Sequence, residues 1–286
     1  MVQEIFKRLN KVRFFQRGTY ILIGAILGDI IGSTREWHNV KSEEFELFPQ
    51  GSRFTDDSVM TISVAEKLLQ NASDVSGNKA YAMWYRQYYK RYPNAGFGQM
   101  FSEWARGEDY RIQRSYGNGA AMRVTPIGYA FEDIKPMLNE VKSSCYYTHH
   151  NNEAIKGAEA VATAVFLARK QEDKESIRKY LEKKYKYIFA ELDTIRDSYV
   201  FDCRTSYSVP PALEAFFESC SYEDAIRKAI SIGGDSDTIA CIAGGVAEAY
   251  YREIPQDIIN RGLSFIDIGF KNVMKEFKEK YMIESY

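Results

Sequence analysis

Two acidic clusters hold the residues best suited to chemistry. The first is Thr55-Asp56-Asp57-Ser58, and the second, far along the chain, is Gly233-Gly234-Asp235-Ser236-Asp237-Thr238. Each places two carboxylates and a threonine hydroxyl just before an apolar stretch with helical spacing. A single cluster of this kind is most simply interpreted as a helix cap that also suits the helix dipole. Two clusters of one design instead indicate a shared site, and the Gly233-Gly234 turn allows other backbone to approach the second one closely.

A metal site follows if these carboxylates converge with Glu36. Glu36, Asp56, Asp57, Asp235 and Asp237 would then bring five negative charges together. Two divalent cations would nearly balance that charge, whereas one cation would leave much of it uncompensated in a poorly solvated place. Carboxylate and hydroxyl oxygens are hard ligands, which suit Mg²⁺, or Mn²⁺, better than Zn²⁺. The sequence therefore predicts a site for two Mg²⁺ ions, with Mn²⁺ as a possible substitute.

A glycine-rich turn, Ser115-Tyr116-Gly117-Asn118-Gly119, is the third motif. A turn of this kind that opens a helix can present backbone N–H groups to an anion such as a phosphate. Asn-Gly turns are also common connectors, so the motif by itself is ambiguous. The Asn94–Gly98 loop is ambiguous for the same reason. His149 precedes the longest predicted helix, where an imidazole serves as a cap, packs in the core or binds a ligand.

Helices must position these motifs, because runs with a period of two residues are almost absent. Only Val200-Phe201-Asp202-Cys203 resembles a short strand, and no partner strand is evident. Apolar residues recur at helical spacing along most of the chain from Ile21 onward. The expected helices include 59–69 after the capping residues 54–58, 81–89, 120–131 with a kink at Pro126, 153–170, 175–189, 211–217, 222–232, 238–251 and 255–280 with a break near Gly269. We therefore expect an all-α protein.

We expect two parts in the chain, a basic N-terminal extension at 1–19 and one domain at 20–286. In the extension, Lys7, Arg8, Lys11, Arg13 and Arg17 oppose a single acidic residue, and its apolar residues have helical spacing. A solvated helix packed on the body is the simplest interpretation of this segment, and an interaction tail is the alternative. No linker rich in Pro, Gly or Ser divides the rest of the chain.

Composition excludes several classes of protein. The 286 residues are 45% hydrophobic and 27% charged, which is typical of a globular protein rather than a disordered one. The net charge of −1 gives no basic field for nucleic acid or an anionic membrane. The longest apolar run, Tyr20–Leu27, is far shorter than the roughly 20 residues of a membrane-spanning helix. We therefore expect neither a membrane protein nor a nucleic-acid-binding protein.

Cysteine and histidine are too few and too scattered for a zinc site. The four cysteines form no CxxC pair, and the sequence has three histidines. Without a recognisable signal peptide, we expect reduced thiols and a cytoplasmic protein. No heptad pattern is present, so we expect a monomer.

Taken together and in this order, the motifs resemble the ADP-ribosylglycohydrolase family. The resemblance covers roughly 21–251 and is carried by GAILGDIIGSTRE, FTDDSVMT, YGNGAAMRVTPIGYAF, THHNNEAIKGAEAVA and IGGDSDTIACIAGGVAEAYY. Each stretch alone is weak, but the TDDS and GGDSDT pair with GDIIG before it and GNG between is specific. The resemblance implies a single orthogonal all-α domain.

The resemblance also implies roles for individual residues. Two metal ions would be held by Thr55, Asp56, Asp57, Asp235, Asp237 and Thr238, with Asp56 and Asp237 as candidates to bridge them. Glu36 and Asp56 would take part in catalysis. The diphosphate of ADP-ribose would lie on Ser115, Tyr116, Gly117, Asn118 and Gly119, and His149 would line the substrate cleft. Ser58 and Arg35 depart from the family pattern, and Arg35 would either pair with Glu36 or face the acceptor.

The activity implied is metal-dependent hydrolysis of the bond between C1″ of the distal ribose and an acceptor, on an ADP-ribosylated protein or a small ADP-ribose conjugate. Two alternatives remain: a protein that binds ADP-ribose without hydrolysing it, and a two-metal phosphohydrolase that cuts the diphosphate. The sequence leaves the acceptor open between arginine, serine, O-acetyl-ADP-ribose and modified nucleic acid. Arg35, Trp37 and the Phe97 loop are candidates to contact it.

Overall fold

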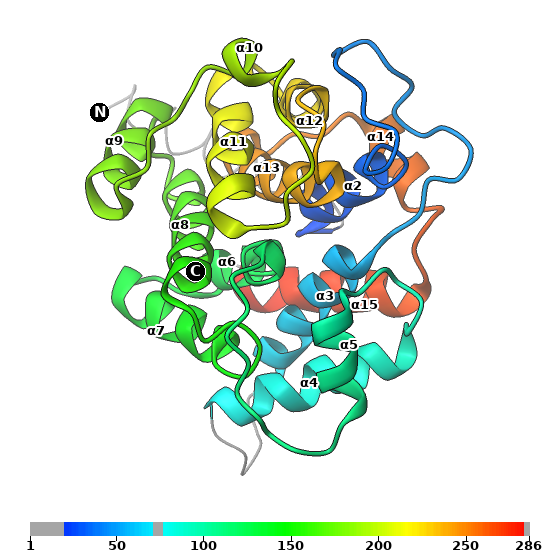
Figure 1. Ribbon diagram of the computed structural model, residues 1–286, viewed down its shortest axis with the longest axis vertical. Coiled ribbons are helices and arrows are strands. Elements are labelled where there is room, and N and C mark those ends of the chain that lie inside the picture. Colours follow the sequence, from blue (N-terminus) through cyan, green and yellow to red (C-terminus); the bar gives the residue numbers. More distant parts are fainter. Residues whose placement is uncertain (1–19, 71–76, 283–286) are drawn as a thin grey trace, which may run out of the picture.

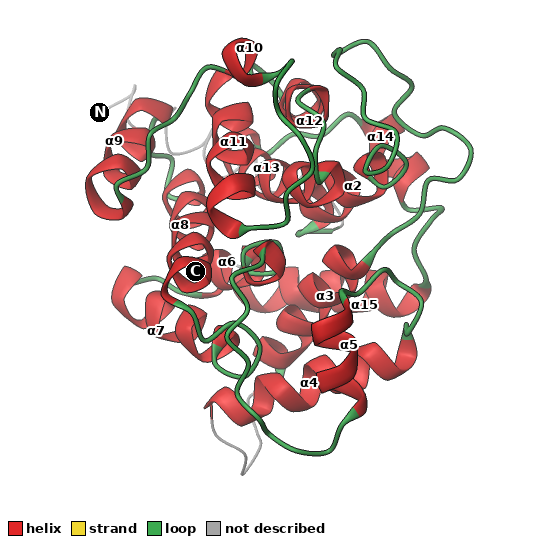
Figure 2. Cartoon of the chain, viewed as in Figure 1, coloured by secondary structure: helices red, strands yellow, loops and turns green. Residues whose placement is uncertain are grey.

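The computed structural model describes residues 20–70 and 77–282, and all regular structure in these two ranges is helical (Figure 2). The predicted all-α class is therefore confirmed, whereas the predicted extension at 1–19 lies outside the described residues. The first helices are α2 (Ile23–Gly32), α3 (Asp56–Leu69), α4 (Gly77–Arg91), α5 (Gln99–Arg106), the 3₁₀ turn η1 (Asn118–Ala120), α6 (Thr125–Ala130) and α7 (Ile134–Cys145). The remaining helices are α8 (Asn152–Arg169), α9 (Lys174–Tyr185), α10 (Leu192–Ile195), α11 (Thr205–Glu218), α12 (Tyr222–Ser231), α13 (Ser236–Tyr251), α14 (Gln256–Gly262) and α15 (Ile268–Tyr281). Among them, none combines the length and the hydropathy needed to cross a bilayer.

The centre of the molecule is the antiparallel pair α2 and α13 (Figure 1). All ten residues of α2 are buried. Gly24, Gly28 and Gly32 recur every four residues and therefore share one face of the helix. A Cβ added at Gly28 would lie 2.1 Å from the carbonyl oxygen of Ala240 in α13. The two backbones are therefore in direct contact, which only glycine permits.

The other helices pack around this pair and share one hydrophobic core with it. Helices α11 and α12 lie on one side of α13, and α3 lies on the other side of the molecule with α4 and α15 against it (Figure 1). Helices α6 and α7 pack on α8, which also contacts α13. The two acidic clusters begin α3 and α13, so the central packing determines the distance between them.

Several helix boundaries differ from those that the sequence predicts. The predicted helix at 211–217 begins six residues earlier, at Thr205, and includes both Pro210 and Pro211. Pro211 has no N–H for the carbonyl of Tyr207, but this carbonyl accepts the hydroxyl of Tyr199 instead (2.9 Å). A tertiary hydrogen bond thus replaces the missing helical one.

Other differences are local. The break predicted near Gly269 lies before Ile268, and Gly269 belongs to the first turn of α15. The helix predicted at 175–189 ends at Tyr185, because Lys186 adopts a left-handed conformation (φ 56°). The region predicted as one kinked helix at 120–131 is split into η1 and α6. Residues 200–203 form no strand, and the amphipathic helix α7 was not predicted.

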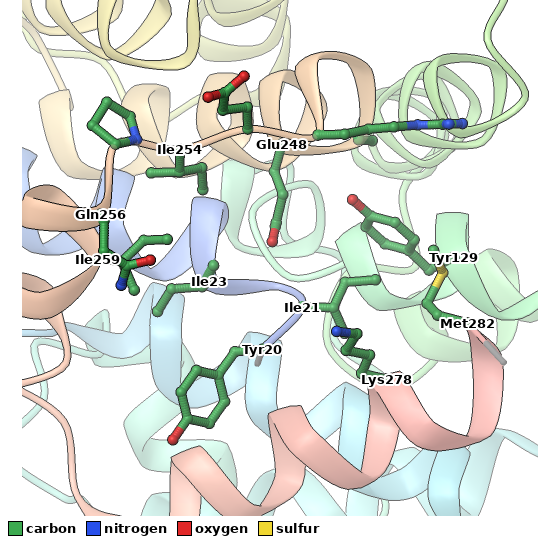
Figure 3. Close-up of a pocket in the computed structure, with 14 residues that line it drawn as sticks. Tyr20, Ile21, Ile23, Tyr129, Glu248, Ile254, Gln256, Ile259, Lys278 and Met282 are labelled. Atoms are coloured by element: carbon green, nitrogen blue, oxygen red, sulfur yellow. The ribbon is translucent and has the colours of Figure 1, made fainter. Parts of the chain in front are cut away.

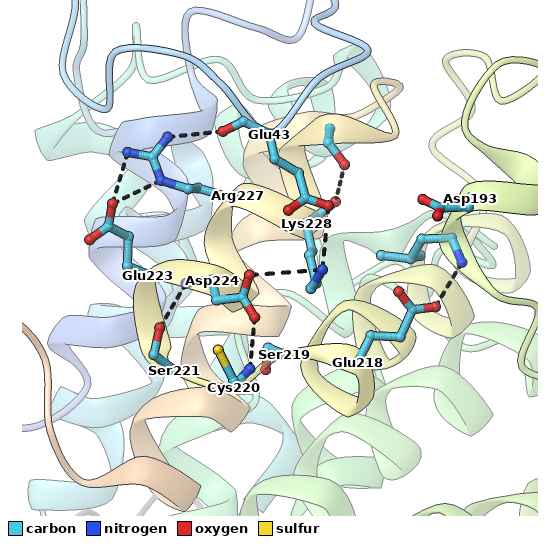
Figure 4. Close-up of polar contacts among 12 residues, drawn as sticks. Glu43, Asp193, Glu218, Ser219, Cys220, Ser221, Glu223, Asp224, Arg227 and Lys228 are labelled. Atoms are coloured by element: carbon cyan, nitrogen blue, oxygen red, sulfur yellow. Dashed lines mark hydrogen bonds and ion pairs between the residues drawn. The ribbon is translucent and has the colours of Figure 1, made fainter.

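The long segment between α2 and α3, residues 33–55, contains no helix and is held by polar contacts with α12 (Figure 4). The Arg227 guanidinium donates to the carbonyl oxygens of Glu43 and Phe45, at 3.0 Å each. Glu43 in turn forms ion pairs with Lys228 and Arg196. These contacts fix the segment that carries Glu36.

A cavity of about 270 Å³ lies at the end of the α2–α13 pair that is opposite to the acidic clusters (Figure 3). Its wall includes Ile23, Tyr129 and Glu248. The Glu248 carboxylate accepts the N–H of Gly24 (3.0 Å) and thereby caps the start of α2. Burial raises the pKa of Glu248 to about 8. This carboxyl has a structural partner, so we assign it to the support of α2.

We predict that Gly28→Ala destabilises the protein by about 3 kcal/mol or more, because the new methyl group would meet backbone atoms that cannot move aside. The matched control is Gly107→Ala, where the added Cβ would meet its nearest neighbour at 3.5 Å and φ is negative. Denaturant unfolding of both variants measures the difference. Equal stability of the two variants would contradict the direct contact between α2 and α13.

Candidate metal centre and cleft

The first acidic cluster is organised by Asp29, a carboxylate in the middle of α2. Asp29 is completely buried and accepts hydrogen bonds from the backbone N–H of Thr55 (2.9 Å) and of Ser58 (3.1 Å). It also accepts both hydroxyl groups of these residues. Asp29 therefore caps α3, which frees Asp56 and Asp57 from that task. Ser58, which departs from the family pattern, retains the hydroxyl that this contact needs.

The second cluster follows a turn in which Gly233 and Gly234 have φ angles of +73° and +76°. These angles favour glycine because a Cβ would be strained there. The turn brings Asp235 and Asp237 to the start of α13, where both side chains are buried. Asp235 accepts the amide N–H of Asn118 (2.7 Å), which links the second cluster to the glycine-rich turn.

Glu36 reaches the second cluster through Asn39. The Asn39 side chain accepts the N–H of Gly234 (2.8 Å) and donates to the backbone carbonyl oxygen of Glu36 (2.9 Å). Lys41 adds a second link, since its ammonium donates to the carbonyl oxygen of Ile232 just before the glycine turn (2.6 Å). Glu36, Asp235 and Asp237 thus form one group.

The carboxylates fall into two trios that share Asp237. One trio is Asp29, Asp57 and Asp237, and the other is Glu36, Asp235 and Asp237; within each, the oxygen atoms lie within 4.8 Å of one another. Asp56 belongs to neither trio. One buried oxygen of Asp57 has no hydrogen-bond partner among the described residues, although a buried charged atom ordinarily has one. The donor set and this unpaired oxygen fit divalent cations with oxygen ligands.

The electrostatics of the cluster support the same conclusion. Burial, and then the negative charge of Asp237, raise the pKa of Glu36 to about 7. Burial raises the pKa of Asp235 to about 6, and it raises those of Asp56, Asp57 and Asp237 well above the usual range with neighbouring carboxylates adding to the effect. In the described part of the chain, no lysine, arginine or histidine forms an ion pair with these groups. The charge of Arg53, which lines the same cleft as Glu36, acts on Glu36 but does not prevent the rise of its pKa.

Five carboxylates, those of Glu36, Asp56, Asp57, Asp235 and Asp237, line a cleft of about 430 Å³, whereas Asp29 is completely buried and does not line it. The structure brings nearly all of the predicted site residues into its wall. They are Glu36, Thr55, Asp56, Asp57, Ser115, Gly117, Asn118, Gly119, His149, Asp235, Asp237 and Thr238. Tyr116, which was also predicted, is 55% exposed and does not line the cleft.

The glycine-rich turn forms one wall of the cleft and is pinned on both sides. Isolated β-bridges pair Arg114 with His149 and Gly117 with Arg204. The N–H of Asn118 donates to the carbonyl oxygen of Cys203 (2.8 Å), and the N–H of Gly117 donates to the Ser115 hydroxyl (3.1 Å). These two backbone donors are therefore engaged within the protein and are not available to a ligand.

Trp37 and the Phe97 loop, two of the three candidates for acceptor contact, line the cleft. Trp37 is 72% exposed and stacks on Phe201, with ring centroids 5.2 Å apart. The third candidate, Arg35, does not line the cleft. Its guanidinium donates to the carbonyl oxygen of Glu46 (2.7 Å) and lies over the ring of Phe45. Arg35 therefore neither pairs with Glu36 nor faces the cleft, and it supports residues 33–55 instead.

Asp29 is the main functional residue that the sequence analysis missed. Its signal was available, since it is a lone carboxylate within a helix whose other residues are all apolar or glycine. Arg123 and Phe201 also line the cleft. Arg123 lies in a stretch that carries the family resemblance and Phe201 in the segment that resembles a short strand, but the sequence assigned neither residue to the site.

The fold and the site thus define an all-helical protein with an acidic cleft whose carboxylates are suited to hold cations. The family model of the ADP-ribosylglycohydrolases matches residues 10–279, and the chain belongs to this family. It is similar to ADP-ribosylhydrolase ARH3 of Xenopus tropicalis (28% identical, 81% of this chain, 86% of the relative) and of Homo sapiens (28%, 80% and 84%). It is also similar to ADP-ribosylarginine hydrolase Tri1 of Pseudomonas putida (26%, 85% and 72%).

One solved structure supports the fold. An ADP-ribosylglycohydrolase-related protein complex contains a chain that superposes with a TM-score of 0.69 at 23% identity, over 94% of this chain and 99% of that one. At this identity the similarity establishes the helical fold, and the shared fold agrees with the family assignment.

We predict that the metal-free protein loses stability as the pH rises from about 4.5 to about 7.5. The cluster carboxyls bind protons more tightly in the folded than in the unfolded chain, because their folded pKa values are raised. Their contribution is present at low pH and is lost as the pH rises through those values. Thermal melting in EDTA measures this loss, and Mg²⁺ at pH 7.5 is expected to reverse it by binding the folded state.

Asp237→Asn is the diagnostic variant for this prediction, because it removes the charge that both trios share. It should raise the melting temperature of the metal-free protein at pH 7.5 and reduce the gain from Mg²⁺. Asp257→Asn, at an exposed position in α14, is the matched control and should behave as the wild type. A wild-type response to Mg²⁺ in Asp237→Asn would refute the metal centre.

Proposed function

We propose that this protein is a divalent-metal-dependent hydrolase that cleaves the bond between the distal ribose of ADP-ribose and an acceptor group. One observation carries the proposal: two carboxylate trios share Asp237 on the floor of a cleft whose wall includes the Gly117-Asn118-Gly119 turn. Membership of the ADP-ribosylglycohydrolase family supports it, as do the names of the relatives, which are hydrolases of ADP-ribosyl bonds.

The first trio, together with Thr55 and Asp56, would hold one cation, and Asp235 and Asp237 of the second trio, with Thr238, would hold another. Magnesium is the expected ion, and manganese is the alternative, since both prefer oxygen ligands. The chemistry that such ions supply when bound is positive charge, which orients the ribose hydroxyls and balances the carboxylates. Asp29 would contribute to the first position, an addition to the ligands expected from the family resemblance.

Departure of the acceptor from C1″ leaves positive character on the ribose ring, as in other glycoside hydrolyses. The carboxylate floor would stabilise that developing charge. Glu36 is suited to accept a proton from the attacking water, because it is half-buried beside Asp237 and its pKa is raised to about 7. The oxygen of that water forms the new bond to C1″, and the acceptor leaves with the bonding electron pair and takes up a proton, so that the proton accepted by Glu36 is balanced when Glu36 returns to its charged form.

The remote parts of the substrate would position the ribose over the floor. Gly119 lies against the His149 ring, since a Cβ at this position would meet the ring at 3.2 Å, and the turn and His149 together form the wall on which the diphosphate would lie. The stacked pair Trp37 and Phe201 stands beside Glu36 and is suited to contact the acceptor. Binding energy from these contacts lowers the cost of placing C1″ for attack.

The experiment that tests this function is a hydrolysis panel. The protein is incubated with Mg²⁺ and, separately, with arginine-linked ADP-ribose, serine-linked ADP-ribose and O-acetyl-ADP-ribose. Release of intact ADP-ribose from at least one substrate, abolished by EDTA, is the expected result and identifies the acceptor class. Release of AMP would indicate cleavage of the diphosphate instead, and binding of ADP-ribose with no release would indicate a binding protein.

We predict that Glu36→Gln lowers kcat by about 10²- to 10⁴-fold on the substrate found in the panel, because the amide cannot accept the proton of water. The KM is expected to change little, since Glu36 acts on water rather than on the remote parts of the substrate. Glu44→Gln, an exposed residue of the same segment, is the matched control. An unchanged kcat in Glu36→Gln would assign the proton transfer to another group.

A further inference from the structure

A chain of buried polar groups leads from Arg123 through Thr148 to His149 at the edge of the cleft. The exposed fractions of Arg123 and Thr148 are 1% each, and that of His149 is 6%. Arg123 Nη2 donates to Thr148 Oγ1 (2.7 Å), and Thr148 Oγ1 lies 2.9 Å from His149 Nδ1. Arg123 also lies over the ring of Tyr85, 4.1 Å from its centroid, and donates to the Ser144 carbonyl oxygen (3.0 Å).

The donor and the acceptor of each of these hydrogen bonds can be assigned from the protons that each side chain carries. A guanidinium can only donate, so Thr148 Oγ1 must accept from Arg123. The Thr148 hydroxyl proton then needs an acceptor of its own, because the residue is buried. Among the described residues, His149 Nδ1 is the one acceptor within reach of that hydroxyl. Thr148 therefore donates to Nδ1, which must carry a lone pair.

The other ring nitrogen of His149 then carries the proton. Burial, and next the positive charge of Arg123, hold the pKa of His149 well below its usual value, so the imidazole is neutral. A neutral imidazole without a proton on Nδ1 has it on Nε2. In the described part of the chain Nε2 has no hydrogen-bond partner, and His149 lines the cleft beside the glycine-rich turn.

We propose that Arg123 and Thr148 are positioning residues that lock His149 in its Nε2–H tautomer, so that it donates a hydrogen bond to the diphosphate of the substrate. The inference rests on the proposed function for the identity of the ligand. A phosphate oxygen can only accept, and the N–H groups of Gly117 and Asn118 are already engaged. The opposite tautomer would present a lone pair to the phosphate and repel it.

Arg123 has a second role in the same proposal. None of the described carboxylates pairs with its guanidinium, and the buried Nε has no partner. Its positive charge lies in the wall of the cleft. An uncompensated buried cation attracts an anion strongly, because the surroundings screen it weakly. The diphosphate is the anionic part of ADP-ribose, whereas adenosine carries no such charge.

The first test reads the tautomer directly and needs no variant. The sequence has three histidines, so the ¹⁵N–¹H correlation spectrum of the imidazoles in the full chain is simple to assign. We expect His149 to show a pyridine-type Nδ1 and a pyrrole-type Nε2 without ligand. The reverse pattern, or a protonated ring near neutral pH, would overturn the proposal whatever the protein hydrolyses.

The second test measures binding by calorimetry in Mg²⁺, with ADP-ribose and adenosine as the two probes. Thr148→Val keeps the shape of the side chain but removes the hydroxyl, and it should weaken ADP-ribose binding about 10-fold or more. Adenosine binding should change less than about twofold, and Thr148→Ser should restore both the ADP-ribose affinity and the tautomer.

The outcomes separate this inference from the proposed function. Equal ADP-ribose affinities of wild type and Thr148→Val would overturn the positioning role. Equal losses for both probes would also overturn it, since they would indicate a general structural disturbance. Failure of the wild type to bind ADP-ribose would instead overturn the proposed function, and with it the ligand assigned to His149.

Discussion

The site depends on the backbone contact between α2 and α13. Gly28 and Gly32 allow the two helices to approach until backbone atoms touch, with Ala240 opposite Gly28 and Asp237 opposite Gly32. Asp29 is the residue after Gly28, so this contact brings it into one trio with Asp237. Any side chain at either glycine would separate the helices. The distance between the carboxylates of α2 and α13 is therefore set by the lack of side chains at Gly28 and Gly32, rather than by a particular attractive contact.

This packing concentrates negative charge, and no lysine, arginine or histidine among the described residues forms an ion pair with it. Burial and mutual repulsion raise the pKa values of the cluster carboxyls, which is unfavourable for the folded metal-free chain near neutral pH. The hydrophobic core around α2 and α13 provides the rigidity that holds the charges together. The same arrangement is favourable once divalent cations bind. Without cations, the clustered carboxylates thus lower the stability of the folded chain. With cations bound, the same carboxylates contribute to it.

The segment between α2 and α3 shows how a part without helix is made rigid. Asn39 and Lys41 bond to the glycine turn and its neighbour, and Arg227 holds the carbonyl oxygens of Glu43 and Phe45. Each of these side chains satisfies backbone groups that no helix satisfies. Glu36 and Trp37 are thereby held at the mouth of the cleft. Glu36, the catalytic candidate, is thus positioned by nearby polar side chains, Asn39 and Lys41, that bond to backbone far away in sequence.

The sequence by itself determined the helical class, the two acidic clusters and the glycine-rich turn, because helical periodicity and local turn chemistry are encoded by neighbouring residues. It also indicated the family, through the order and spacing of those motifs. Only the tertiary structure decided that Asp29 joins the acidic clusters, that Arg35 turns away from them, and that α11 continues through Pro210 and Pro211. It also decided that Thr148 orients His149. These outcomes rest on contacts between distant segments, and local sequence cannot specify which buried polar atoms will meet.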